Sequence, residues 1–199
     1  YTSGYSDDSE VVVLQGDVGD GGERSIDFGE SFDSNVDDWD IISLDGLDAP
    51  AYVDLSDVDQ NYDVEVLERN HSSGHNVIAY VDGAEGVFGT EYDDSFRGDG
   101  ASNILHGGAG DDYVFGGDGA DLISGGTGSD YVFGGDGADV VIDFDGDTIF
   151  GGTGSSGQTT YQTDDDTFIV GQGTTIGDFD LSPDGAGLSG RSNQVNDIV

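Results

Sequence analysis

In the middle of the chain, short apolar segments alternate with Gly/Asp-rich turns at a period of nine residues. Four consecutive segments fit the pattern Gly-Gly-x-Gly-x-Asp-x-U-x, in which U is a large apolar residue. They are residues 107–115 (GGAGDDYVF), 116–124 (GGDGADLIS), 125–133 (GGTGSDYVF) and 134–142 (GGDGADVVI). A fixed period of this kind indicates a repeat architecture, in which each copy packs only on its neighbours.

Degenerate copies extend the pattern in both directions. Residues 89–97 (GTEYDDSFR) and 98–106 (GDGASNILH) keep position six as Asp94 and Asn103. Downstream, Asp147 arrives one residue early, and residues 151–154 (GGTG) open a further copy. An insertion near residues 155–165, rich in Ser, Gly, Gln and Thr, precedes the return of the pattern at residues 166–168. We expect this insertion to be a surface loop.

The repeat predicts its own local structure. Glycines at positions one, two and four permit positive φ, so the first six residues are expected to form a tight loop and the last three a short strand. Side chains alternate along a strand, so U points to one side while positions seven and nine point to the other. Two repeats then form one coil of eighteen residues, and the stacked U residues form a thin core. These are Leu105, Val114, Ile123, Val132, Val141 and Ile149.

Stacking of the coils brings acidic residues together. Loops eighteen residues apart stack at a strand spacing of roughly 4.8 Å, which predicts Asp112 over Asp130 on one edge and Asp121 over Asp139 on the other. Carboxylates this close repel one another unless a cation lies between them. Calcium prefers six or more oxygen ligands from carboxylates and carbonyls. We therefore expect several bound Ca²⁺ ions, whose binding contributes directly to folding.

These nonapeptides resemble those of the repeats-in-toxin (RTX, hemolysin-type) calcium-binding family. The resemblance is strong over residues 89–154 and weaker over 52–180, where residues 51–55 and 86–99 are similar to the lead-in that precedes such repeats. It implies an all-β fold, a right-handed parallel β-roll (a β-solenoid). It also implies a secreted protein that leaves the cell unfolded through a type I channel and folds in extracellular calcium.

The resemblance further implies a ligand set: positions two, four and six of one loop with positions one, three and six of the loop eighteen residues on. Two sites follow, Gly108, Gly110 and Asp112 with Gly125, Thr127 and Asp130, and Gly117, Gly119 and Asp121 with Gly134, Asp136 and Asp139. Weaker sites pair Asp94 with Gly107, Ala109 and Asp112, and the neutral Asn103 with Gly116, Asp118 and Asp121. The remaining candidate metal-binding residues are Gly126, Gly128, Gly135, Gly137 and Asp147. The one-residue shift leaves open whether Asp130 pairs with Asp147, and Asp139 with Gly151 and Thr153.

Outside the repeats, the chain divides into three regions. Residues 1–86 form a β-rich N-terminal region packed on the roll or leading into it, residues 87–180 the roll itself, and residues 181–199 a closing segment. Short apolar segments predict strands in the first region, at residues 11–14, 26–28, 39–44, 52–55, 64–67 and 77–81. None has the length or period of a helix.

Composition narrows the choice of partners. The 199 residues contain 43 acidic and 4 basic residues, for a formal net charge of −39. A polyanion of this kind repels nucleic acids and anionic membrane surfaces, so its expected partners are cations. No run of 18 apolar residues predicts membrane insertion, and the absence of Cys excludes disulfides and thiolate metal sites. An excess of acidic residues is also typical of proteins from high-salt habitats. Such an excess would not place Asp at the same position of each repeat.

No residues form a recognisable catalytic motif, so we expect no enzymatic activity and no catalytic residues. His71 and His75 are four residues apart, but the intervening Ser-Ser-Gly favours a loop, and the Glu of an HExxH zinc-peptidase motif is missing. His106 occupies position nine of a repeat and is expected on a strand surface.

Aromatic residues recur at positions seven and nine: Tyr113 and Phe115, then Tyr131 and Phe133. On one outward face they form an exposed patch, which usually packs against something. We expect either a cover from elsewhere in the chain or self-association. The first functional hypothesis is a structural or adhesive subunit of a cell-surface or filamentous assembly. The alternative is an accessory module for folding, secretion or targeting to a substrate such as a polysaccharide, in a larger secreted enzyme like a serralysin-type protease or an alginate epimerase.

Overall fold

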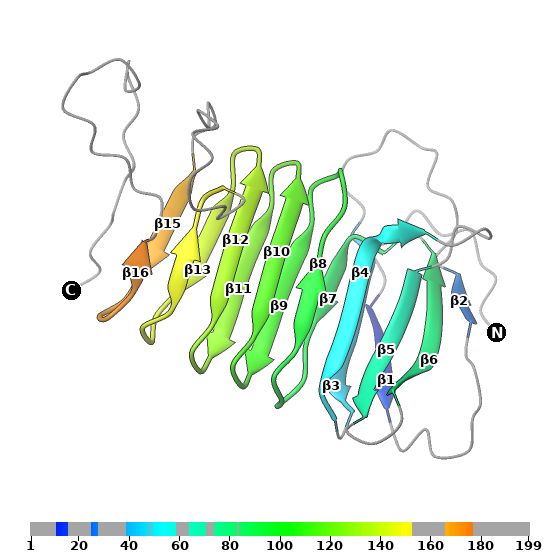
Figure 1. The fold of residues 1–199 in the computed structure, drawn as a ribbon. Coiled ribbons are helices and arrows are strands. Elements are labelled where there is room, and N and C mark those ends of the chain that lie inside the picture. Colours follow the sequence, from blue (N-terminus) through cyan, green and yellow to red (C-terminus); the bar gives the residue numbers. More distant parts are fainter. Residues whose placement is uncertain are drawn as a thin grey trace.

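A computed structural model describes residues 11–15, 25–27, 39–47, 49–58, 64–70, 74–82, 84–152 and 166–176. Every regular element in these ranges is a β-strand, and the strands form two sheets (Figure 1). The first sheet has the order β1-β3-β7-β9-β11-β13-β15, and the second β16-β14-β12-β10-β8-β4-β5-β6-β2. From β7 onward, consecutive strands along the chain alternate between the two sheets.

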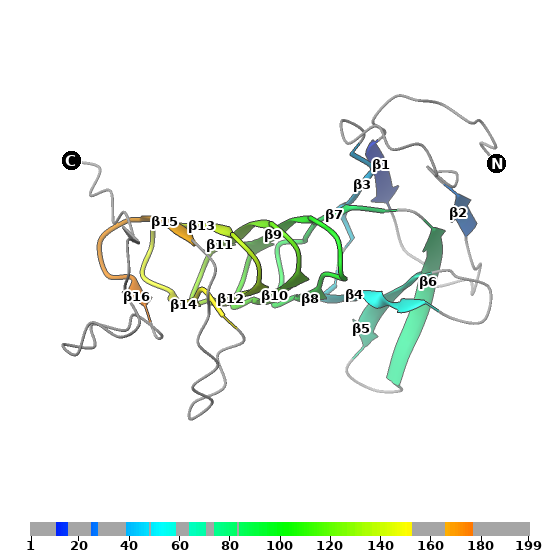
Figure 2. The same cartoon turned by 90° about the horizontal axis from the view of Figure 1, so that it is seen from above.

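This alternation produces a parallel β-roll, as the sequence predicts. Figure 2 looks along the strands from above, so that the roll runs across the picture with its two sheets facing each other and loops connecting them. The strands of the first sheet are β7 (Gly86–Phe88), β9 (Ile104–Ala109), β11 (Leu122–Thr127), β13 (Val140–Asp143) and β15 (Thr167–Val170). Those of the second are β8 (Ser95–Arg97), β10 (Tyr113–Asp118), β12 (Tyr131–Asp136), β14 (Thr148–Phe150) and β16 (Thr175–Ile176).

Register follows the eighteen-residue coil. Tyr113 pairs with Tyr131 in the β10–β12 ladder, and Leu122 pairs with Ile104 in the β11–β9 ladder, in both cases in parallel. The strands are longer than the three residues predicted, since pairing continues through the glycines: Gly117 lies beside Gly135. Only positions four to six of a strict repeat form the turn, because pairing with the next coil continues through positions one to three.

The core is the predicted row of U side chains. All six have exposed fractions of 0–1%. The row continues into the flanking coils through Ile42, Val53, Val87, Phe96 and Phe168. Burying one such side chain contributes roughly 1.5–3 kcal/mol. Alternate U residues come from the first and the second sheet, so the two sheets enclose one continuous core.

All six N-terminal segments predicted as strands are strands: β1 (Val11–Gln15), β2 (Ser25–Asp27), β3 (Ile41–Gly46), β4 (Ala51–Val58), β5 (Val64–Asn70) and β6 (Gly74–Asp82). β3 pairs in parallel with β7, and β4 with β8, so they lead directly into the roll. β1 extends the first sheet beyond β3, while β5 and β6 extend the second in antiparallel fashion (Figure 1). The sheets are thus continuous across residue 86, and the division at that point stays a prediction.

At the other end, the coil length changes twice. β14 follows β12 after seventeen residues, with Tyr131 beside Thr148, and β15 lies beside β13 with Val140 paired to Thr167. The predicted insertion at 155–165 and the closing segment at 181–199 lie outside the described residues. Within the described ranges there is no helix of the length and apolarity needed to cross a membrane.

Candidate calcium-binding loops

Two of the three glycines in each strict repeat have the left-handed backbone that the sequence predicts. In the loop that begins at Gly107, φ is 119° at Gly108 and 116° at Gly110, and the same pair of positions has positive φ in the other three strict repeats. Side chains disfavour this conformation. The prediction is wrong for position one, where none of the four glycines has a positive φ.

Position one needs glycine because no space is left for a side chain. A Cβ on Gly107 would collide with Oδ2 of Asp112 and with the carbonyl oxygen of Gly125. On the other edge, Gly116 is confined in the same way by Asp121 and the carbonyl of Gly134. The carboxylate at position six therefore folds back over the first residue of its own loop, and next to a carbonyl of the following coil.

The position-six side chains form a row along each edge of the roll. In each row, the backbone N–H of one residue donates to the side-chain Oδ1 of the residue one coil further on. The first row is Asp94, Asp112, Asp130 and Asp147, with N···O distances of 2.7, 2.8 and 2.9 Å. The second is Asn103, Asp121, Asp139 and Asp166, with distances of 2.8, 2.9 and 3.1 Å. The predicted stacking of Asp112 with Asp130 and of Asp121 with Asp139 is confirmed.

The second oxygen of several of these carboxylates lacks a hydrogen-bond partner. Within the part of the chain that the structure describes, Oδ2 is buried without any donor in Asp112, Asp121, Asp130 and Asp147. Their side chains are only 1–2% exposed. A buried carboxylate oxygen without a partner is strongly unfavourable unless the group is protonated or binds a cation. A row of such oxygens is what a hard divalent cation with oxygen ligands requires.

Burial also shifts the acidities of these groups. It raises the pKa of Asp112 from its ordinary 3.8 to about 8 and that of Asp121 to about 7, with nearby carboxylates adding to the shift. The pKa of Asp130 is raised for the same reason. Near neutral pH, the metal-free loops therefore hold carboxylates in a setting that disfavours their charge. A bound cation would reverse this effect, because it favours the ionised form.

Comparison with protein families agrees with this geometry. The model described as "RTX calcium-binding nonapeptide repeat (4 copies)" matches residues 88–123 and 115–142. These are RTX calcium-binding repeats. They bind Ca²⁺, and the repeat domain is a structural module rather than a catalytic one. No curated protein matches the chain.

The first RTX-like loop differs from those that follow it. Oδ1 of Asp94 accepts from the N–H of Ala51 at 2.7 Å and from the hydroxyl of Thr90 at 3.0 Å, and its Oδ2 accepts from the N–H of Thr90 at 2.6 Å. Both oxygens are therefore satisfied by the chain itself. Thr90 and Tyr92 stand where strict RTX repeats have glycine. Asp94 thus lacks the partnerless oxygen that marks Asp112.

In the second loop, the polar side-chain atoms of Asn103 also find their hydrogen-bond partners within the chain. The side-chain Oδ1 of Asn103 accepts from the N–H of Asp99 at 3.0 Å, and its Nδ2 donates to the carbonyl of Glu85 at 3.3 Å. A neutral amide can make both contacts, whereas a carboxylate could make only the first. The first RTX coil therefore carries two position-six residues that need no ion to satisfy their polar atoms.

The structure also resolves the pairings that the shift left open. Asp147 follows Asp130 in its row, and Gly151 accepts from the N–H of Gly135 at 2.8 Å. The carbonyl oxygen of Gly151 lies beside Asp139, because a Cβ on Gly134 would meet both of them. Asp166 follows Asp139 in the row of position-six side chains. The sequence pattern places Asp166 at the return of the strand phase but not among the candidate ligands, because the insertion separates it from its row. Thr153 lies outside the described residues.

The aromatic residues share one outer face, as predicted, but they are not equally exposed. Tyr113 and Tyr131 are 48% and 54% exposed, whereas Phe133 is only 8% exposed. Phe133 is covered by its neighbours: its ring centroid lies 4.8 Å from Phe150 in a stacked pair and 5.1 Å from Tyr113. The guanidinium of Arg97 lies 5.4 Å from the ring centre of Phe115. The exposed patch thus consists mainly of the two tyrosines.

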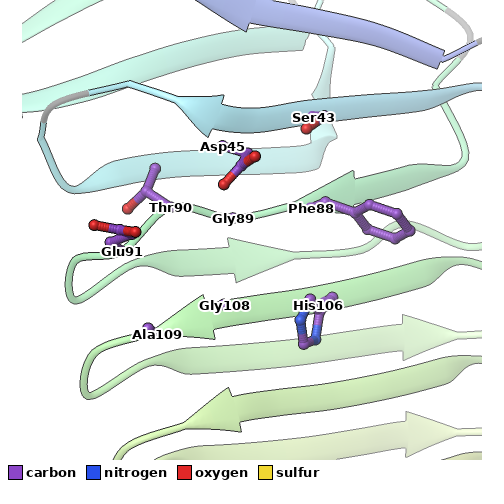
Figure 3. Close-up of a pocket in the computed structure, with 9 residues that line it drawn as sticks. All are labelled: Ser43, Asp45, Phe88, Gly89, Thr90, Glu91, His106, Gly108 and Ala109. Atoms are coloured by element: carbon purple, nitrogen blue, oxygen red, sulfur yellow. The ribbon is translucent and has the colours of Figure 1, made fainter.

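His106 lies on the outer face of the first sheet, as predicted, next to Phe88 at a centroid distance of 6.1 Å. Together with Asp45, Thr90 and Glu91 they line a cleft of about 340 Å³ near the start of the roll (Figure 3). Both acidic residues of the cleft are exposed, so it lacks the buried oxygens of the calcium loops. His71 lies outside the described residues, and His75 belongs to β6 rather than to the loop predicted.

Proposed function

We propose that this chain is an extracellular calcium-binding protein whose RTX roll folds when calcium binds. The observation that carries the proposal is the set of buried Oδ2 atoms that have no donor among the described residues. Their position beside carbonyls of the next coil supports the ligand sets predicted from the sequence, for example Asp112 with Gly125. RTX repeats are typical of secreted proteins, which supports an extracellular location.

The test is circular dichroism of the full chain, with and without millimolar Ca²⁺ and with Mg²⁺ as the control. Calcium is expected to produce a gain of β signal that magnesium does not reproduce, because Mg²⁺ requires a smaller octahedral site and gives up its water reluctantly. An unchanged spectrum on adding calcium would overturn the proposal.

We further propose that the folded chain is a non-enzymatic structural or adhesive subunit that self-associates through the Tyr113 and Tyr131 face. Two large aromatic side chains about half exposed, on a flat sheet face with Phe133 and Phe150 stacked beside them, support this role. Aromatic residues are enriched in protein interfaces because they bury a large area with few rotatable bonds.

Sedimentation velocity in calcium distinguishes this role from the alternative of an accessory module. The wild type is expected to form large assemblies, and Tyr113→Ser with Tyr131→Ser to remain monomeric. Leu122→Ser is the control, because Leu122 is 40% exposed on the opposite sheet. A wild type that folds in calcium but stays monomeric would contradict self-association and favour the accessory module, for which binding of a polysaccharide would be the next assay.

A further inference from the structure

The loop at residues 143–147 (DFDGD) differs from the strict RTX loops in its side chains. It is one residue shorter, and it begins with Asp143 where the strict repeats have a glycine that cannot carry a side chain. Carboxylate oxygens of Asp143, Asp145 and Asp147 all lie within 4.8 Å of one another. Three carboxylates therefore converge in one loop, whereas each strict loop contributes one from its buried position six.

The contacts of this cluster leave one buried oxygen without a donor among the described residues. Asp143 is 1% exposed, and its two oxygens accept from the N–H of Asp145 at 3.0 Å, from the N–H of Asp147 at 3.3 Å and from the hydroxyl of Thr174. Asp145 accepts from the N–H of Gly128 at 3.2 Å. Asp147 is 2% exposed, and its Oδ1 accepts from the N–H of Asp130. Its Oδ2 is buried with no donor from the described chain.

The neighbouring coils hold the loop in place on both sides. On one side, Gly128 and Asp130 donate to its carboxylates. On the other, the N–H of Gly171 donates to the carbonyl of Asp143, and the N–H of Thr175 to that of Asp147, both at 2.7 Å. In the folded roll, the backbone of the neighbouring coils thus holds the three carboxylates in one place. Among the described side chains the one Lys or Arg is Arg97, which lies against Phe115 and not in this cluster.

We propose that Asp143, Asp145 and Asp147 form a separate divalent-cation site, made chiefly of side-chain carboxylates, at the coil where the repeat loses one residue. It differs from the RTX ligand set, which takes one carboxylate and several carbonyls from each loop. Calcium affinity rises with the number of charged ligands and with the rigidity of the site. The site is therefore the tightest among the described residues and fills first among them, which fixes the C-terminal end of the roll. This inference rests on the proposed calcium-dependent folding.

The test is isothermal titration calorimetry of the full chain with CaCl₂, on metal-free protein. Asp143→Asn with Asp145→Asn is expected to remove one calcium per chain, and to remove it from the tightest binding step. Asp45→Asn with Glu91→Gln is the matched control. It removes two charges from exposed residues of the cleft near the start of the roll, which belong to none of the calcium ligand sets. The control is expected to bind as many ions as the wild type, at lower affinity at most.

Asp145→Asn alone guards against a variant that fails to fold. Asp145 is exposed, and an Asn oxygen still accepts the N–H of Gly128, so this variant is expected to show the normal calcium-induced spectrum and at least a tenfold loss of affinity in the tightest step. Wild-type stoichiometry and affinity in both variants would overturn the separate site while leaving calcium-dependent folding intact. If the wild type takes up no calcium, calcium-dependent folding fails together with this site.

Discussion

The first RTX coil and the coils that follow it share one register but satisfy their polar groups differently. In the first coil, Asp94 and Asn103 have side-chain atoms paired with donors and acceptors of the chain. In the next coils, Asp112 and Asp121 keep one buried oxygen without a donor. The comparison shows that the shared register does not by itself create a calcium site. A site arises where the neighbouring loop leaves a buried carboxylate oxygen without a donor.

The largest expected effect comes from the space at position one. Gly116→Ala would push a Cβ into Oδ2 of Asp121 and the carbonyl of Gly134, so we expect a loss of about 3 kcal/mol or more in the free energy of unfolding with calcium present. Gly100→Ala is the control within the first coil. A Cβ at Gly100 meets no atom within 4 Å, and its φ is not positive. Urea denaturation of both variants measures the difference, and equal losses would contradict this account of position one.

The next comparison is Asp112→Asn against Asp94→Asn. At Asp112 the amide oxygen still accepts the N–H of Asp94, but the buried charge and the anionic ligand are lost. We expect this variant to be more stable than wild type without calcium and less stable with it, by about 1–3 kcal/mol in each case.

At Asp94 the amide instead places a donor against the N–H of Thr90, so stability is expected to fall both with and without calcium. Urea denaturation in calcium and in chelator measures both variants. If Asp112→Asn changed the stability equally in calcium and in chelator, the proposed difference between the two coils would be wrong.

A smaller effect concerns pH. The pKa of Asp112 is raised to about 8, and those of Asp121 and Asp147 to about 7. Carboxyls with a higher pKa in the folded state than the ordinary 3.8 bind protons more tightly when folded. Their contribution to metal-free stability is therefore complete below about pH 4 and is lost as the pH rises to about 8.

Thermal unfolding of metal-stripped protein should thus give a higher midpoint at pH 5 than at pH 8. With saturating calcium, the order should reverse, because protons compete with the ion. Asp112→Asn combined with Asp121→Asn controls for general charge repulsion, and should weaken the pH dependence without calcium. A pH dependence unchanged by these substitutions would place its origin elsewhere in the chain.

The repeat made much of this fold predictable from the sequence. The U residues, the eighteen-residue stacking and the stacked Asp pairs follow from period and alternation alone, and Ile123 over Leu105 is found as expected. The six N-terminal strands also follow from local patterns.

Three features depended on contacts that a period does not encode. Asp94 is satisfied by Ala51, 43 residues away. Asp166 joins its row only after an insertion. The glycine at position one is confined by Asp112 rather than by its own backbone angle.

Hydrogen–deuterium exchange of the full chain, compared between calcium and chelator at pH 8, tests the central claim most directly. It reports protection along the roll amide by amide. We expect the amides of Asp112, Asp121 and Asp130 to be protected in calcium and to lose most of that protection in chelator, while the Asn103 loop loses less. Equal protection of the Asp112 and Asp130 amides in both conditions would contradict the central claim.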